Sequence, residues 1–223
     1  MIKGYGVEKP HFFLFYISDK KIMDLPVYKA QIDGEDTGMY TVSLVDFPAV
    51  ESNFQYFDKD VKPMTFAVED EEQRIVTGVV MRCDFPIYRR DENGYEYYII
   101  YDKPTIEVMA EKWLAEGFAN SVNLMHDADR YVDGVYLKEV YFKDADRGIA
   151  PKGFDDITDG SMFASYKVMN DEVWESIKSG EFKGFSLEGW FSVKRVETPE
   201  EMAENALIDE ILGMLDEIKN KVK

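Results

Sequence analysis

The sequence has a single cysteine and only two histidines among its 223 residues. The one thiol, Cys83, excludes an intramolecular disulfide and is compatible with a reducing compartment. Cys83 ends an apolar run and has neither a histidine nor a second cysteine near it, so we expect a buried structural thiol and no zinc site. His11 and His126 are the only imidazoles that the chain offers for acid–base chemistry.

Positive charge is also scarce, because 26 lysines and arginines stand against 44 aspartates and glutamates and leave a net charge of -18. Proteins that bind nucleic acid need cations to displace phosphate counterions, so direct nucleic-acid binding is not expected. An acidic surface also suits an anionic membrane poorly. The start of the chain lacks the apolar stretch of a signal peptide, and the apolar run at 12–17 is too short to span a bilayer.

Apolar residues are plentiful at 45% of the chain, with 15 Phe and 14 Tyr, which predicts a sizeable core. Many of them alternate with polar residues, which is the period of a strand. Strands are predicted at 11–17, 27–32, 39–45, 54–57, 64–68, 75–83, 85–90, 95–101, 121–126, 135–142, 161–169 and 184–193, and helices from Pro104 to the closing Gly117 and at 170–179. Asn93-Gly94 predicts a hairpin turn. The pattern indicates an α+β fold with a mainly antiparallel sheet or barrel and flanking helices.

The C-terminal segment has a different pattern. It opens at 198–201 with a capping box that has proline in the first turn. Apolar residues then recur at heptad spacing, at Ile208, Ile211, Leu215, Ile218 and Val222. Two heptads are too few for a stable free coiled coil, so this helix either docks on the body or joins partners. The expected division is a body at 1–196 and an amphipathic helix at 197–223.

Ser186 is the candidate nucleophile, at a polar position of the alternating stretch 184–193. A serine hydroxyl is a weak nucleophile and needs a base within hydrogen-bond reach, a role that suits His126. An oxyanion would need backbone donors, which the glycine-bounded entry can present from the N–H groups of Ser186 and Leu187. Gly189 comes one residue too late for the G-x-S-x-G elbow. From the residue types alone, a solvent-facing strand serine and a strand-end histidine are the alternative.

Other polar clusters point to weaker sites. His126 is followed by Asp127 and Asp129, but hard cations require more oxygens in a defined loop. The acidic turns at 144–146 and 155–160 lack the spacing of a calcium loop. We therefore expect no metal and no cofactor. His11, the second candidate base, precedes an aromatic run, where a packing role is expected.

Four separated blocks resemble the tailed-phage prohead serine proteases, which mature capsids, and among them the XkdF-like group. The blocks are YTVSLVDFPA at 40–49 with Asn53-Phe54 beyond, VNLMHD at 122–127, Trp174-x-x-Ile177-x-x-Gly180, and GFSLEG at 184–189. The resemblance covers roughly residues 27–193. It implies a fold similar to the herpesvirus assemblin proteases, a small β-barrel ringed by helices, and endopeptidase activity. It also implies Ser186 as the nucleophile and His126 as the general base.

The resemblance leaves the third member of the catalytic triad open. In the commoner prohead proteases an acidic residue lies in a strand that reads roughly L-x-E-V-S, and Thr41 stands at the matching position here. A hydroxyl orients an imidazole but stabilises an imidazolium less than a carboxylate does. Either Asp46, Asp127 or Glu188 supplies the charge, or the site works as a serine–histidine dyad.

The resemblance further implies that phage scaffold and major capsid proteins are the partners and substrates of a homo-oligomer. The expected location is the host bacterial cytoplasm, inside the immature capsid. Prohead proteases often cut after a hydrophobic-x-Glu pattern, which recurs at Glu210 and Glu217, so the terminal helix is a candidate scaffold-binding or self-cleaved segment. The alternative function is a catalytically silent capsid assembly protein that keeps the protease fold.

Overall fold

The computed structural model of the chain describes residues 25–35, 37–46, 67–91, 93–197 and 199–221. The predicted strands at 11–17 and 54–57 lie outside these residues, as does His11. Elsewhere the predicted elements are present, with boundaries that shift by a few residues. The fold is a mixed α+β fold in which strands predominate, as the sequence indicates.

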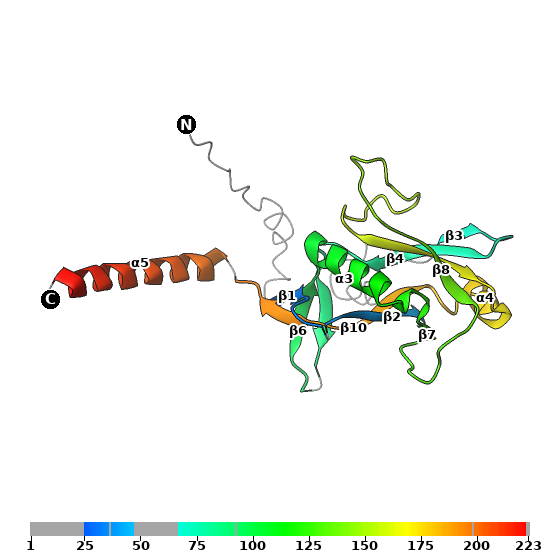
Figure 1. Ribbon diagram of the computed structural model, residues 1–223, viewed down its shortest axis with the longest axis horizontal. Helices are drawn as coiled ribbons and strands as arrows, with labels where there is room; N and C mark the ends of the chain where they lie inside the picture. The colour runs from blue at the N-terminus through cyan, green and yellow to red at the C-terminus, as the bar shows by residue number, and fades with distance from the viewer. Residues whose placement is uncertain (1–24, 36, 47–66, 92, 198, 222–223) are drawn as a thin grey trace.

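The described strands form three sheets (Figure 1). The first has the order β11-β1-β6-β5, from β11 (Ser192–Arg195), β1 (Val27–Gln31), β6 (Glu96–Ile100) and β5 (Ile87–Arg90). The second has the order β10-β2-β7, from β10 (Gly184–Trp190), β2 (Gly38–Val45) and β7 (Val122–Leu124). The third has the order β3-β4-β9-β8, from β3 (Ala67–Asp70), β4 (Ile75–Met81), β9 (Met162–Val168) and β8 (Val135–Phe142). None of these sheets closes on itself within the described chain, so the barrel remains a prediction.

The predicted strand at 184–193 is two strands, because it breaks at Phe191 and changes sheets. Its first part, β10, pairs antiparallel with β2, and its second part, β11, pairs antiparallel with β1. The register shifts between Glu188 and Gly189. A side chain at Gly189 would place its Cβ 2.4 Å from the carbonyl oxygen of Gly38, so only glycine fits this close approach. The bulge that it permits lets one stretch of chain serve two sheets.

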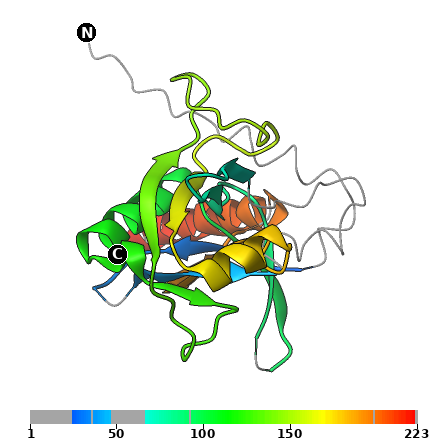
Figure 2. The ribbon, with the colours of Figure 1, turned by 90° about the vertical axis from the view of Figure 1, so that its right-hand side faces the viewer.

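The helices of the described chain are α3 (Lys103–Ala115), the short 3-10 helix η2 (Phe118–Asn120), α4 (Asp171–Lys178) and α5 (Pro199–Lys221). Two of the helices, α3 and α4, bury their apolar residues in the core, as their spacing predicts. Ile106, Met109 and Trp113 of α3 are fully buried in the core. Asn170 caps α4 by accepting a hydrogen bond from the N–H of Val173 at 3.1 Å, as predicted. Figure 2 shows α4 in front, at the end of the molecule opposite α5.

The core lies against one face of β10 and β2. Phe185 of β10 packs on the ring of Tyr166, with ring centroids 5.2 Å apart, and Val42 and Leu44 of β2 are buried beside it. Because side chains alternate along a strand, the neighbouring polar residues project from the opposite face. That opposite face carries Ser186.

Candidate active site

A row of small polar side chains crosses β10, β2 and β7. Ser186 is the register partner of Ser43 on β2, and Ser43 is the partner of Asn123 on β7. Partners in a ladder project to the same face, so the three side chains are neighbours. Ser43 and Asn123 are fully buried and Ser186 is 5% exposed. The sheet therefore presents a serine at its β10 edge, backed by a buried polar pair.

His126 is presented by a tight turn that follows β7. The predicted strand at 121–126 ends at Leu124, and the N–H of Asp127 closes the turn on the Leu124 carbonyl at 3.1 Å. Met125 and His126 both adopt left-handed backbone angles, with φ of 57° and 58°. Such angles cost a non-glycine residue roughly 1–2 kcal/mol each. The hydroxyl of Ser43 helps to hold the turn by accepting a 3.0 Å hydrogen bond from the N–H of His126.

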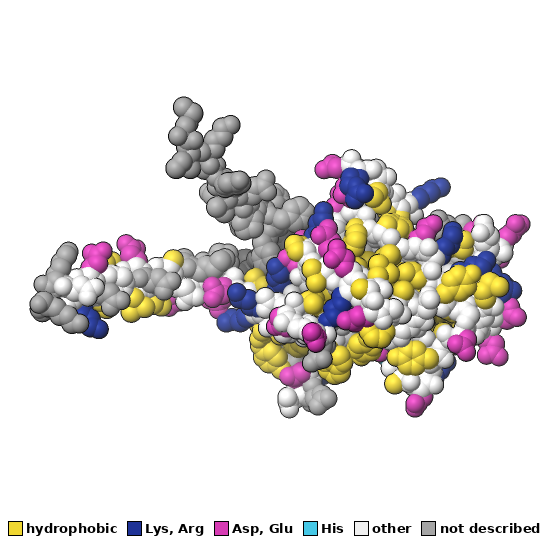
Figure 3. Space-filling view, viewed as in Figure 1, with side chains coloured by type: hydrophobic (Ala, Val, Ile, Leu, Met, Phe, Trp, Pro, Cys, Tyr) yellow, Lys and Arg dark blue, Asp and Glu magenta, His cyan; other side chains and the backbone are white. Residues whose placement is uncertain are grey.

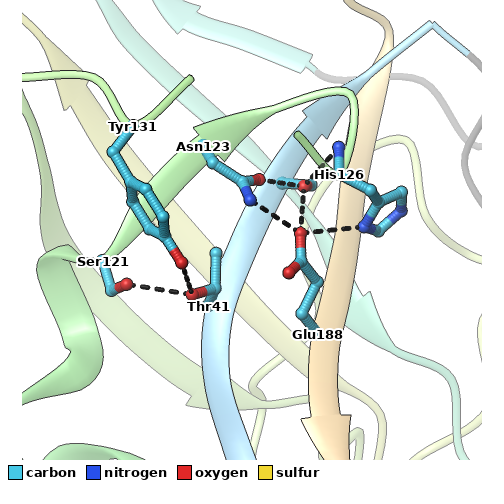
Figure 4. Close-up of polar contacts among 7 residues, drawn as sticks. Thr41, Ser121, Asn123, His126, Tyr131 and Glu188 are labelled. Atoms are coloured by element: carbon cyan, nitrogen blue, oxygen red, sulfur yellow. Dashed lines mark hydrogen bonds and ion pairs between the residues drawn. The ribbon is translucent and has the colours of Figure 1, made fainter. Parts of the chain in front are cut away.

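The His126 ring contacts a carboxylate of β10. Its Nδ1 lies 3.0 Å from Oε1 of Glu188, and the same oxygen accepts hydrogen bonds from Asn123 Nδ2 at 2.8 Å and from Ser43 Oγ at 2.9 Å (Figure 4). Ser43 also hydrogen-bonds to Oδ1 of Asn123. A hydroxyl carries one proton, so Ser43 donates to Asn123 or to Glu188 at any moment. Three side chains from three different segments thus converge on one carboxylate oxygen.

The environment of Glu188 keeps it ionised. Partial burial raises the pKa of this carboxyl, but the hydrogen bonds from Asn123, Ser43 and His126, together with the charge of His126, outweigh it, and the pKa is lowered from its ordinary value. The Glu188 side chain is 17% exposed and that of His126 is 45% exposed. An ionised acceptor at Nδ1 selects the tautomer with a proton there, which leaves the lone pair of Nε2 free to accept a proton.

Ser186 lies next to this pair. It precedes Glu188 by two residues on the same face of β10, and its register partner Ser43 contacts both Glu188 and the His126 turn. In the described part of the chain no hydrogen bond joins the Ser186 hydroxyl to the His126 ring. The structure therefore brings histidine and carboxylate into direct contact and places the serine beside them on the same surface.

The other candidates for the third position do not contact the His126 ring in the described structure. Thr41 Oγ1 bonds instead to Ser121 Oγ at 2.9 Å and to the Tyr131 hydroxyl at 3.0 Å (Figure 4). Asp127 accepts a hydrogen bond from the N–H of Asp129 at 2.9 Å within its own turn. Asp46 approaches this region through its backbone, whose N–H donates to Met125 Sδ at 3.4 Å. Glu188 is the one candidate whose carboxylate meets the imidazole.

Sequence reasoning did not single out Ser43 or Asn123. Both stand inside the blocks of resemblance. In the sequence, Ser43 is an ordinary polar position of a strand and Asn123 an ordinary amide, so neither residue type indicates a role in a site. Their roles come from strand pairing, since Ser43 and Asn123 are 80 residues apart in sequence. The signal that was available is the Ser-x-Glu spacing, because residues two apart in a strand share a face.

The backbone next to Ser186 offers a donor on the side of β10 that does not pair with β2. The N–H of Val42 donates to the Ser121 carbonyl at 3.1 Å, and the Leu44 carbonyl accepts from Met125 at 3.0 Å, so both residues direct their backbone groups to β7. Ser43, between them, therefore faces β10 and pairs with Ser186. The N–H of Leu187, one residue further, points away from β2, at the edge of this three-stranded sheet.

The described residues form neither a metal site nor a membrane-spanning helix. No group of three or more His, Cys, Asp or Glu side chains there is arranged to hold a metal ion. No helix in the same part of the chain has the length and apolar character to cross a membrane. Glu210 and Glu217, the two candidate self-cleavage residues, are exposed on α5.

Comparison with known proteins gives two matches. The family described as "Putative phage serine protease XkdF" matches residues 62–195. The phage-like element PBSX protein XkdF of Bacillus subtilis (strain 168) is 32% identical over 167 residues, which cover 71% of this chain and 54% of that protein. The chain thus spans about half the length of the curated relative that it matches. No solved structure matches the chain.

Proposed function

Because the chain belongs to the XkdF-like group of phage serine proteases, we propose that it is a serine endopeptidase of capsid maturation. The observation that carries the proposal is the contact between His126 Nδ1 and Glu188 Oε1, two residues along the strand from Ser186. A histidine held by a carboxylate beside a serine is the arrangement that serine proteases on unrelated folds share. The order of the three residues along the chain does not matter to this chemistry.

In the proposed reaction the Ser186 hydroxyl attacks the carbonyl carbon of the scissile peptide bond. Nε2 of His126 takes the hydroxyl proton and then gives it to the leaving amine, which leaves an acyl ester on Ser186. Water attacks the ester carbonyl in the second half and gives a proton to Nε2 of His126, which passes it to Ser186 Oγ as the ester bond breaks and the acid product leaves. The hydrogen bond between serine and base is often long in an enzyme without substrate and shortens when substrate binds.

Two further groups support the chemistry. Glu188 keeps the Nδ1 proton in place and stabilises the imidazolium that forms in each half-reaction. The N–H of Leu187 binds the developing oxyanion from the side of β10 that faces away from β2, whereas that of Ser186 is occupied by the pairing with Ser43. Ser43 and Asn123 are positioning residues, because they act on the reaction only through Glu188 and the His126 turn.

A fluorophosphonate probe tests the proposal, because it labels only a serine that a base has activated. We expect labelling of the wild-type protein and its loss in Ser186→Ala and in His126→Ala. Ser179→Ala, at the end of α4, is the matched control and keeps the label. Folded wild-type protein that takes up no label contradicts the proposal and supports the alternative, a catalytically silent assembly protein with the same fold.

The proposed substrates are phage scaffold and major capsid proteins, cut inside the immature capsid in the host bacterium. The tail is a further proposed substrate, because Glu210 and Glu217 each end a hydrophobic-x-Glu triplet and are exposed on α5. If the chain is a protease of this kind, its three sheets correspond to the small barrel of the assemblin-type proteases. An experimental structure of the whole chain tests this correspondence.

A further inference from the structure

Helix α5 leaves the body with its apolar side uncovered. In Figure 1 it extends away from the sheets, and in Figure 3 a row of hydrophobic side chains follows it on one side. Ile208, Ile211, Leu215 and Ile218 are between 45% and 58% exposed. Side chains of this size are normally buried in a folded helix, so the surface is one that a second molecule can cover.

The exposed residues form a seam with coiled-coil spacing. From Ile208 to Ile218 they follow one another at steps of three, four and three residues, the period of helices that supercoil around each other. Leu207 and Leu212, which flank the seam, are 57% and 54% exposed and widen it. A helix that packs its seam against an identical seam satisfies both copies at once.

The charges along α5 decide how two copies would be oriented. The same spacing continued backwards places Glu201 and Glu204 on the seam near the start of the helix, whereas Lys219 stands near its end. In a parallel pair each glutamate would face the same glutamate of the second molecule, and the repulsion between the two like charges would destabilise the pair. In an antiparallel pair that places Ile208 against Ile218, Glu204 of one copy lies near the end of the other copy, where Lys219 stands. Glu201 already forms an ion pair with Arg195 at 2.7 Å. The preference for the antiparallel orientation therefore comes mainly from Glu204.

We propose that two copies of this chain associate through an antiparallel pairing of their α5 helices. The seam residues then form apolar layers in which Ile208 faces Ile218 of the second copy and Ile211 faces Leu215 of the second copy. The helix would be about 34 Å long at 1.5 Å per residue, so the two bodies stand at opposite ends of the pair. The pairing does not depend on the proposed protease activity, because no residue of the site takes part in it.

Sedimentation of the full chain over a range of concentrations tests the association. The Ser186→Ala background removes self-cleavage as a complication. We expect concentration-dependent dimers, and at least tenfold weaker association in Ile211→Asp or Leu215→Asp. Gly213→Asp is the matched control, because it adds the same charge on the opposite side of the helix, where no other atom lies within 4 Å of the added Cβ, and it leaves the dimer intact.

Cysteine cross-linking tests the orientation. Cys83 is buried, so it does not compete with cysteines introduced on α5. Mixing Ile208→Cys with Ile218→Cys protein should give mainly the mixed disulfide, whereas each variant alone cross-links poorly. Efficient cross-linking of Ile208→Cys to itself contradicts the antiparallel pair. A chain that stays monomeric at every concentration overturns the whole proposal, whether α5 then folds back on the body or awaits another protein.

Discussion

At the scale of single residues, the proposed mechanism depends most directly on Glu188. Replacing it by glutamine keeps the size of the side chain but removes the charge that stabilises an imidazolium at His126. We expect Glu188→Gln to lower the rate of fluorophosphonate labelling or peptide cleavage by about 10³–10⁴-fold, the loss seen when a triad carboxylate becomes an amide. Thr41→Val is the control, because Thr41 does not contact the ring. Equal losses in both variants would contradict the assignment.

The lowered pKa of Glu188 also predicts how stability depends on pH. Partial burial opposes the shift and the hydrogen bonds from Asn123, Ser43 and His126 produce it. A carboxyl with a depressed pKa stabilises the folded state above its unfolded pKa of about 4.3, and this contribution is lost as the pH falls through the folded pKa. The difference in melting temperature between wild type and Glu188→Gln should therefore be larger at pH 7 than at pH 3. An unchanged difference would show that Glu188 is not ionised in the folded protein.

Ser43 should affect both stability and activity. Ser43→Ala removes a buried hydroxyl that contacts Glu188 and accepts from the His126 N–H, so we expect a loss of about 1–3 kcal/mol in the free energy of unfolding. The catalytic rate should fall as well, because the His126 turn is no longer held. Ser165→Ala removes a buried hydroxyl of the third sheet, bonded to Thr77 at 2.7 Å, and should lower stability by a similar amount without a loss of rate per folded molecule. Denaturant unfolding and active-site titration measure the two effects.

At the scale of elements, the bulge in β10 is the most constrained point. Gly189→Ala places a Cβ against the Gly38 carbonyl, and relieving that contact requires the backbone of β2 or β10 to move. We expect a loss of about 1–3 kcal/mol in stability, as for other overpacked sites. Gly213→Ala, in the open middle of α5, should instead strengthen the helix by up to about 1 kcal/mol. If Gly189→Ala leaves the free energy of unfolding unchanged, the close approach at the bulge is not required for the fold.

The sequence predicts most elements but not how they bend. Asn93-Gly94, the cap Asn170 and the alternation in 39–45 each have a local cause, and the hairpin, α4 and β2 follow from them. The break at Phe191 does not, because Phe191 and Val193 continue the odd-numbered apolar positions of Phe185 and Leu187. The early end of β7 was missed for a similar reason: Met125 and His126 give no sign of left-handed angles, which the bond from the Met125 N–H to Leu44 and the closing turn impose.

The candidate site divides in the same way. Residue types and resemblance select Ser186 and His126, and the contact between His126 and Glu188 is a tertiary one across 62 residues. The sequence left four candidates for the third member of the triad. Asp127 and Glu188 lie close to His126 or Ser186 in sequence, and Thr41 and Asp46 lie in a block that carries the resemblance. Strand register alone does not separate them, because Thr41 is the register partner of Glu188 and lies on the same face. Side-chain contacts do, since Glu188 reaches the His126 ring whereas Thr41 bonds to Ser121 and Tyr131.

At the scale of the whole molecule, the body should fold without its tail. Few described contacts tie α5 to the body, and the clearest is the ion pair of Arg195 with Glu201 on the surface. Surface ion pairs contribute about 0–1 kcal/mol. A chain that ends at Val196 should therefore melt within a few degrees of the full-length Ser186→Ala protein in thermal denaturation. A drop of ten degrees or more would show that α5 packs on the body in solution.

Two of the three groups in the proposed site share one short stretch of backbone. Ser186 and Glu188 are fixed relative to each other by the pleat of β10, while the imidazole arrives on a separate turn after β7. In a site built this way, the position of the imidazole depends on one turn, while the alcohol and the acid stay in register on their strand whatever that turn does.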